Sequence, residues 1–121
     1  MPLRTLIVDD SARFLDAASD LLGREGLTVV GVASTGDETR RQAEALQPDV
    51  ILVDVFLGKE SGLDLARRLV DETDGTTVIL ISSHSEADLA DLIAASPAAG
   101  FVPKTQLSAS AIRRIVGDRS A

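Results

Sequence analysis

Short apolar segments alternate along the chain with stretches in which apolar residues recur at helical spacing. The apolar segments predict strands over residues 5–8, 27–32, 50–53, 78–81 and 100–102. The helical patterns predict helices over 14–22, 35–46, 63–70, 89–93 and 107–116. Because each predicted strand is followed by a predicted helix, the pattern indicates an α/β fold, with a parallel sheet covered by helices on both faces.

Local signals indicate where two of the helices begin and end. Ser11 is a candidate N-cap of the first helix, and Gly26 is a candidate stop signal. Ser85 and Asp88 have the spacing of a capping box and predict the start of the fourth helix. The apolar stripe expected on the first helix consists of Phe14, Ala17, Ala18, Leu21 and Leu22.

The bulk composition narrows the class of protein. The chain of 121 residues suits one domain, which we expect to cover 1–121. It contains no cysteine, which excludes disulfides and thiolate metal sites. The net charge of −7 and the presence of only three aromatic residues disfavour direct nucleic-acid binding and base stacking. Because we find no secretory signal pattern and no segment of membrane-spanning length, we expect a cytoplasmic protein without a membrane contact.

Polar and charged residues gather where the predicted strands end. In chain order they are Asp9, Asp10, Asp54, Ser82 and Lys104. In a parallel α/β sheet these strand ends meet at one edge, where ligands bind. Three close carboxylates repel one another unless a cation neutralises them, and Mg²⁺ prefers such oxygen ligands. The ammonium and hydroxyl groups remain for a second, anionic group, so the pattern predicts a site that handles a phosphoryl group.

Five short motifs cover these strand ends. They are Leu6-Ile7-Val8-Asp9-Asp10, Asp49-Val50-Ile51-Leu52-Val53-Asp54, Ser61-Gly62-Leu63, Ile79-Leu80-Ile81-Ser82-Ser83 and Gly100-Phe101-Val102-Pro103-Lys104. With these motifs the chain resembles, over essentially its whole length, the receiver domain of the response regulators of two-component signalling. The resemblance implies a doubly wound, flavodoxin-like fold: a five-stranded parallel sheet with strand order 2-1-3-4-5 and five helices.

The resemblance also implies a metal-dependent phosphoacceptor. It implies that Asp54 takes a phosphoryl group from a histidine kinase or a histidine phosphotransfer protein. It implies that Asp9, Asp10 and Asp54 hold Mg²⁺ together with the backbone carbonyl of Phe56. Such a protein is a signalling phosphoacceptor and not an enzyme, apart from self-phosphorylation by phosphodonors and autodephosphorylation.

The same resemblance implies roles for further residues. Lys104 is expected to bind the phosphoryl oxygens, Ser82 to be the switch hydroxyl and Phe101 the switch aromatic. Phe56 and His84, each two positions after a site residue, are expected to flank the route by which water reaches the phosphoryl group. The output partner stays open between a separate protein and an output domain in a longer chain, and a phosphorylation-dependent homodimer is a further candidate.

The chain departs from the family pattern at two places. The family often has Pro and then Gly at the fourth and fifth positions after the acceptor, where this chain has Gly58 and Lys59. We therefore expect this loop to be more flexible. The switch aromatic is Phe101 instead of Tyr, so a contribution from a phenolic hydroxyl is absent.

Three alternatives to a receiver share some of these features. A haloacid-dehalogenase-like phosphohydrolase usually needs a second acid two residues after its nucleophile, and that position is Phe56. A flavodoxin-like cofactor binder needs a phosphate loop after the first strand, but Asp9 and Asp10 would repel a phosphate. A pseudo-receiver that serves only as an interaction module would keep the fold, and the full acidic set with Ser82 and Lys104 argues against it.

Overall fold

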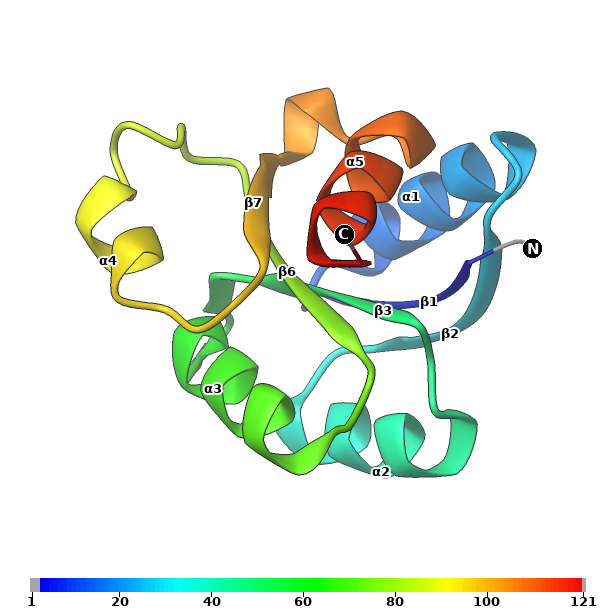
Figure 1. Ribbon diagram of the computed structural model, residues 1–121, viewed down its shortest axis with the longest axis horizontal. Coiled ribbons are helices and arrows are strands. Elements are labelled where there is room, and N and C mark those ends of the chain that lie inside the picture. The colour runs from blue at the N-terminus through cyan, green and yellow to red at the C-terminus, as the bar shows by residue number, and fades with distance from the viewer. Residues whose placement is uncertain (1–2, 121) are drawn as a thin grey trace.

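A sheet of five parallel strands lies at the centre of the computed structural model, which describes residues 3–120 (Figure 1). Its strands are β1 (Arg4–Val8), β2 (Thr28–Ala33), β3 (Val50–Asp54), β6 (Thr77–Ser82) and β7 (Gly100–Pro103). Their order is β2-β1-β3-β6-β7. This order confirms the predicted 2-1-3-4-5 arrangement, because β4 and β5 belong to a separate small sheet. Residues 1, 2 and 121 of the expected domain 1–121 lie outside the described residues.

Helices cover both faces of the sheet, as the doubly wound fold predicted (Figure 1). α1 (Ala12–Arg24) and α5 (Ala109–Ser120) lie on one face, and α2 (Gly36–Leu46) and α3 (Gly62–Glu72) lie on the other. The short α4 (Ala90–Ala94) lies beside β7 at the edge of the sheet. Among the described residues, none of these helices has the length and apolarity needed to cross a membrane.

The sheet separates two hydrophobic cores. Because side chains alternate between the two faces of a strand, Leu6 and Val8 belong to the core under α2 and α3, while Ile7 belongs to the core under α1 and α5. All residues of the central strand β3 are buried, as expected for a strand covered on both faces. The buried apolar residues of β1 and β3 thus determine where each strand ends. They also determine where the residues that follow each strand lie.

The first helix begins as predicted but buries a different stripe. Ser11 caps α1, because its hydroxyl accepts a hydrogen bond from the N–H of Phe14, and the helix ends before Gly26, whose φ is 98°. Ala17 is exposed, contrary to the prediction, and Leu15 is buried in its place. The fully buried positions of α1 are Leu15, Ala18 and Leu22, which share one face at helical spacing.

The fourth and fifth helices begin later than the sequence predicted. Ser85 accepts the expected hydrogen bond from the N–H of Asp88, but residues 86–89 form turns and α4 starts only at Ala90. Leu92, one of the apolar residues on which the predicted helix 89–93 rests, is 45% exposed. A short 3₁₀ helix, η1 (Lys104–Gln106), precedes α5, so Leu107 is buried but lies outside the helix.

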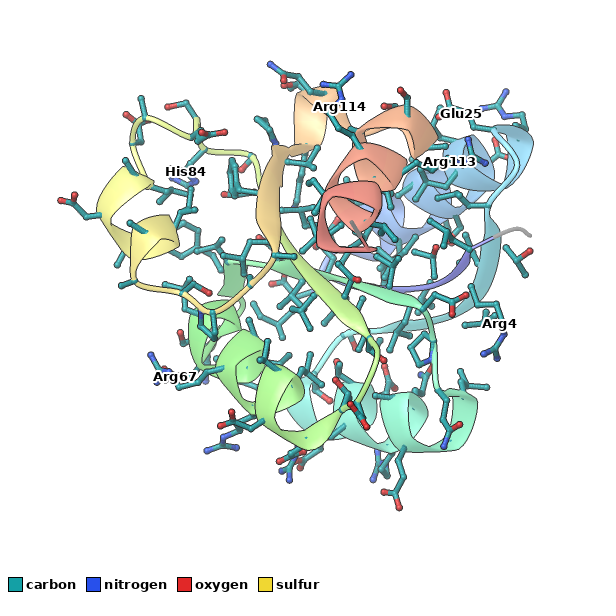
Figure 2. The ribbon with its side chains drawn as sticks, viewed as in Figure 1. Arg4, Glu25, Arg67, His84, Arg113 and Arg114 are labelled. Carbon is teal, nitrogen blue, oxygen red and sulfur yellow. The ribbon has the colours of Figure 1, made fainter. Side chains whose placement is uncertain are left out.

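Glu25 connects the end of α1 to the start of α5 (Figure 2). Its side chain accepts a hydrogen bond from the N–H of Ala109, and its backbone carbonyl accepts one from Arg113. A carboxylate is favourable at this place because the first N–H groups of a helix have no partner within the helix. The contact fixes the two helices on the same face of the sheet.

Candidate functional site

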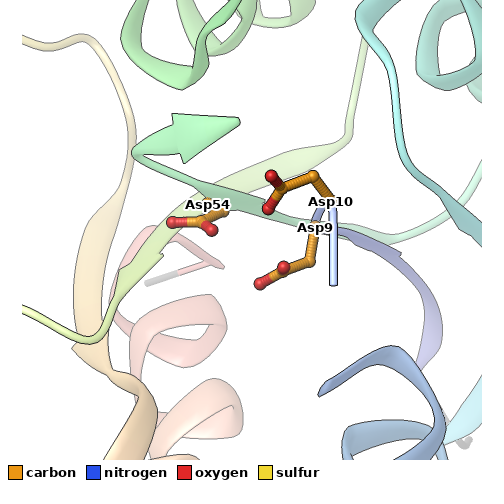
Figure 3. Close-up of side chains that lie close together, drawn as sticks. All are labelled: Asp9, Asp10 and Asp54. Carbon is orange, nitrogen blue, oxygen red and sulfur yellow. The ribbon is translucent and has the colours of Figure 1, made fainter. Parts of the chain in front are cut away.

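Three carboxylates lie together at the carboxyl edge of the sheet (Figure 3). Asp9 and Asp10 follow β1, and Asp54 is the last residue of β3. β1 and β3 are hydrogen-bonded neighbours in register, Val8 beside Val53, so their ends coincide. One ligand atom from each of the three side chains lies within 4.8 Å of the other two. Asp9 is fully buried, Asp54 is nearly so, and Asp10 is exposed.

Backbone N–H groups orient two of these carboxylates. The N–H of Ser11 donates to Asp9 Oδ1 at 2.8 Å, and the N–H of Phe56 donates to Asp54 Oδ1 at 3.2 Å. In each case the donor lies two residues after the carboxylate, as in a turn that an aspartate stabilises with its own side chain. The second oxygen of each carboxylate therefore remains for another partner.

That partner is the ammonium of Lys104, which comes from η1 directly after β7. Its Nζ lies 2.6 Å from Asp9 Oδ2 and 3.2 Å from Asp54 Oδ2. The contact with Asp54 is a hydrogen bond, whereas Asp9 Oδ2 makes an ion pair without hydrogen-bond geometry. Nζ also lies 4.4 Å from the centroid of the Phe14 ring, a cation–π contact from α1.

The crowded charges change the proton affinity of two groups. Burial raises the pKa of the Asp54 carboxyl above its ordinary value; the charge of Lys104 opposes this rise and the charge of Asp9 adds to it. Burial alone would lower the pKa of Lys104, but its contacts with Asp9 and Asp54 outweigh burial and the pKa is raised. At neutral pH the lysine is therefore charged, while the negative charge of Asp54 carries a free-energy cost.

The donor set fits a hard divalent cation. Carboxylate oxygens at this spacing are the ligands that Mg²⁺ takes, usually with several waters and phosphate oxygens. The buried Asp9 Oδ2 has no hydrogen bond among the described residues and is matched only by the charge of Lys104, so it has the capacity to accept a metal bond. A soft metal would find no thiolate here, because the chain has no cysteine.

Ser82 and His84 lie beside the carboxylates, at the end of β6. Asp54 pairs with Ile81 in the sheet, which places the buried Ser82 one residue further along the neighbouring strand. Ser82 Oγ accepts a hydrogen bond from the N–H of His84 and lies 3.4 Å from its Nδ1. The imidazole also contacts the ring of Phe56, so the two residues expected to flank a water route contact each other.

Phe101 lies on β7, where it pairs with Leu80 of β6. Its side chain is half-buried and packs against the core under α2 and α3. The structure therefore brings Asp9, Asp10, Asp54 and Lys104 into one cluster, places Ser82 next to it, and leaves Phe101 on the edge strand.

A small hairpin that the sequence did not predict follows the third carboxylate. β4 (Phe56–Leu57) and β5 (Glu60–Ser61) pair in an antiparallel manner around Gly58 and Lys59. Gly58 has a φ of 58° at the first central position of the turn, where a positive φ favours glycine. Gly62, at the start of α3, packs so closely that a Cβ would lie 1.7 Å from the carbonyl oxygen of Asp54.

The chain is similar to known signalling proteins. The family described as the response regulator receiver domain matches residues 5–116. A protein-glutamate methylesterase/protein-glutamine glutaminase of Bacillus subtilis is 39% identical over 85 residues, which cover 69% of this chain and 24% of that protein. The transcriptional regulatory protein PdtaR of Mycobacterium tuberculosis is 27% identical, over 95% of this chain and 60% of that protein.

A solved structure extends this similarity to the fold. The signal receiver domain of the response regulator NarL from Mycobacterium tuberculosis superposes with a TM-score of 0.82 at 26% identity, over 96% of this chain and 98% of that one. The chain spans about a quarter of the methylesterase and 60% of the transcriptional regulator that it matches.

Proposed function

Because this chain belongs to the family of response regulator receiver domains, we propose that it is a phosphorylation switch whose acceptor is Asp54. The observation that carries the proposal is the pairing of Lys104 with both Asp9 and Asp54 beside a third carboxylate, that of Asp10. A cation-binding carboxylate cluster with an ammonium over it can neutralise a phosphoryl group as it arrives.

The proposed reaction forms an acyl phosphate. One carboxylate oxygen of Asp54 forms a bond to phosphorus while the phosphorus–nitrogen bond of a donor phosphohistidine breaks, and the departing imidazole nitrogen takes up a proton from solvent. Asp9, Asp10, Asp54 and the backbone carbonyl of Phe56 would hold Mg²⁺. When bound, Mg²⁺ supplies charge neutralisation for the transferring group.

Lys104 and Ser82 are proposed to bind oxygens of the new phosphoryl group. The ammonium exchanges its contact with Asp54 for one with a phosphoryl oxygen, while Asp9 would remain available to hold Mg²⁺. The hydroxyl of Ser82 moves toward another phosphoryl oxygen and gives up its contact with His84, which lies 3.4 Å away in this structure. Phe101 then moves into the space that Ser82 vacates, and the surface around α4, β7 and α5 changes. The change is a shift between two packings, and its size depends on how differently they contact the phosphoryl group.

We propose a histidine kinase or a histidine phosphotransfer protein as the donor partner. The output is an unidentified protein, or an output domain joined to the receiver in a longer chain, since the matched relatives are longer than this chain. Homodimerisation on phosphorylation is a further proposed outcome. Direct nucleic-acid binding is not proposed, because the net charge of −7 opposes contact with phosphates.

Intact-mass measurement after incubation with acetyl phosphate and Mg²⁺ tests the assignment of the acceptor. We expect the wild type to gain one phosphoryl group and Asp54→Asn to gain none. Asp16→Asn, a substitution of an exposed aspartate on α1, is the matched control and should be phosphorylated like the wild type. Equal phosphorylation of Asp54→Asn would overturn the assignment.

NMR titration of the unphosphorylated protein with Mg²⁺ tests the metal site separately. We expect the amide signals around residues 9–11, 54–58 and 82–84 to shift, and we expect Asp10→Ala to weaken this response. Shifts confined to other parts of the sheet, or an unchanged response in Asp10→Ala, would contradict the proposed ligands.

A further inference from the structure

A carboxylate outside the acidic cluster joins the β4–β5 hairpin to α2. Glu60 lies on β5, and its Oε2 accepts a hydrogen bond from the N–H of Gly36, the first residue of α2, at 2.9 Å. The first N–H groups of a helix have no partner within the helix and lie at the positive end of its dipole, so a carboxylate is a favourable acceptor there. A Cβ on Gly36 would lie 2.5 Å from Glu60 Oε2, so the glycine makes this approach possible.

The same hairpin carries one of the proposed metal ligands and lies next to another. Phe56, which carries the proposed carbonyl ligand, pairs with Ser61 across the hairpin. At the turn, a Cβ on Gly58 would lie only 3.3 Å from Oδ2 of Asp10. The position of the hairpin therefore sets both where the Phe56 carbonyl lies and how much room the Asp10 carboxylate has.

α2, which Glu60 contacts through Gly36, is itself connected to the acidic cluster. α2 follows β2 after a short connection, and the carbonyl of Ala33 at the end of β2 accepts a hydrogen bond from the N–H of Asp9 at 3.0 Å. Glu60 thus connects the hairpin to the segment that holds the buried carboxylate. The turn consists of Gly58 and Lys59 and contains no proline, so it lacks the restraint that a fixed proline φ supplies.

We propose that Glu60 is a positioning residue for the metal site. By holding the hairpin on α2, it keeps the Phe56 carbonyl and the Asp10 carboxylate directed at one cation, and so provides a restraint that the turn sequence lacks. This inference rests on the proposed function, because it presumes that the acidic cluster binds Mg²⁺. Its consequence is specific: loss of the contact weakens Mg²⁺ binding and leaves the phosphoryl-transfer step at saturating Mg²⁺ nearly unchanged.

The test compares Glu60→Ala with Glu60→Gln. Both remove the charge, but the glutamine amide oxygen can still accept the hydrogen bond from Gly36. In Mg²⁺ titrations followed by amide chemical shifts, we expect Glu60→Ala to raise the apparent Kd about threefold to tenfold, and Glu60→Gln to stay within about twofold of the wild type. Without Mg²⁺, the Gly36 amide should lose exchange protection in Glu60→Ala and keep it in Glu60→Gln.

Two further variants separate the loss of the contact between Glu60 and Gly36 from the loss of a surface carboxylate in general. Glu72→Ala removes an exposed carboxylate that pairs with Arg40 between α2 and α3, and it should leave the Kd for Mg²⁺ unchanged. Gly36→Ala displaces Glu60 from the other side of the contact and should reproduce the effect of Glu60→Ala. The rate with acetyl phosphate at saturating Mg²⁺ should stay within about twofold in all four variants.

The outcomes separate this inference from the proposed function. If Glu60→Gln weakens Mg²⁺ binding as much as Glu60→Ala does, the effect is one of charge and the positioning role is wrong. If neither changes the Kd while the wild type binds Mg²⁺ and is phosphorylated at Asp54, only this inference is overturned. If the wild type shows no Mg²⁺ response at the acidic cluster, the proposed function fails and the inference fails with it.

Discussion

The ring of Phe56 lies against the imidazole of His84, with the ring centroids 4.9 Å apart and the planes inclined by 55°. Phe56 is also next to the proposed acceptor, because its N–H donates to Asp54 Oδ1. The backbone N–H of His84 donates to Ser82 Oγ, and its Nδ1 lies 3.4 Å from the same hydroxyl. The two rings in contact form the Phe56–His84 wall, and the backbone of its first residue is hydrogen-bonded to the carboxylate that is proposed to carry the phosphoryl group.

This wall is expected to lengthen the life of the phosphorylated state. An acyl phosphate is lost when water attacks in line with the departing Asp54 oxygen, and Phe56 offers such a water no hydrogen bond. We expect Phe56→Asn to speed dephosphorylation about tenfold, a change of about 1.4 kcal/mol in the barrier. His84→Ala should change the rate less. The measurement is loss of phosphoprotein at fixed Mg²⁺ after removal of acetyl phosphate.

Two results would contradict this account of the wall. An unchanged or slower rate in Phe56→Asn would show that Phe56 packs on the hairpin without excluding water. A marked slowing in His84→Ala alone would instead make His84 the residue that orients the attacking water.

Gly62 should be intolerant of even the smallest side chain. A Cβ at this position would lie 1.7 Å from the carbonyl oxygen of Asp54 and 2.9 Å from that of Val55, and both atoms belong to the backbone and cannot swing away. We expect Gly62→Ala to lower the free energy of unfolding by about 3 kcal/mol, measured by urea denaturation. Gly23→Ala is the control, because nothing lies within 4 Å of its Cβ and alanine favours the helix by about 0.5–1 kcal/mol. Equal stability of Gly62→Ala and the wild type would contradict the close approach.

The positions of the strands and the acidic cluster could be predicted from the sequence for a physical reason, whereas the strand order followed only from the resemblance to a known family. Each buried strand is an unbroken apolar run, so the polar residue that ends it marks its carboxyl end, and parallel pairing brings these ends to one edge. Asp9 after β1 and Asp54 at the end of β3 are found in this way. The reasoning fails where burial is partial, as for Ala17 on α1 and Leu92 on α4, because apolar residues are so frequent in these segments that the sequence pattern fits more than one buried face.

Other parts of the site depend on contacts that leave no periodic signal. The β4–β5 hairpin has strands of two residues each, too short for an alternating pattern. The contacts from Glu60 to Gly36 and from Phe14 to Lys104 join residues far apart in the chain, and each residue alone is unremarkable. The only local signal for the turn in the sequence is the dipeptide Gly58-Lys59. On its own this dipeptide predicts a flexible loop and no paired strands.

Asp54 is expected to lower the stability of the unphosphorylated protein. Its pKa is raised in the folded state, first by burial, so its ionisation is less favourable in the folded than in the unfolded chain. Folding stability from this group is present below its unfolded pKa and is lost as the pH rises through the folded pKa. Asp54→Asn should therefore be more stable than the wild type at pH 7, by on the order of 1 kcal/mol, or about 3–6 °C in Tm for a domain of this size.

The dependence of this stability difference on pH and on Mg²⁺ tests whether the charge of Asp54 is its cause. The gain should shrink as the pH falls through the raised pKa, because the wild-type carboxyl then becomes neutral as well. Mg²⁺ should stabilise the wild type more than Asp54→Asn, since a ligand that binds the folded state more tightly stabilises it more. Asp16→Asn, at an exposed position of α1, should show neither trend. A destabilised Asp54→Asn at pH 7 would contradict the assigned cost of this charge.

The contact of Lys104 with the Phe14 ring is expected to hold the ammonium in place before phosphorylation. Nζ lies 4.4 Å from the ring centroid and is largely shielded from solvent, a setting in which a cation–π contact contributes about 0.5–2 kcal/mol. Phe14→Leu keeps an apolar contact and removes the ring face. We expect it to lower the free energy of unfolding by about 1 kcal/mol and to slow phosphorylation by acetyl phosphate about threefold at saturating Mg²⁺.

A double-mutant cycle separates this contact from the loss of packing. Phe14→Tyr keeps a ring and should behave like the wild type in both measurements. In a Lys104→Met background, Phe14→Leu should cost less stability than in the wild type, and the difference, about 0.5–1 kcal/mol, is the coupling energy between the two residues. Because the Lys104 ammonium also pairs with Asp9 and Asp54, the cycle is best measured with Mg²⁺ present, so that these carboxylates keep a counter-charge. A coupling energy near zero would show that the Phe14 ring only fills space and does not stabilise the Lys104 ammonium.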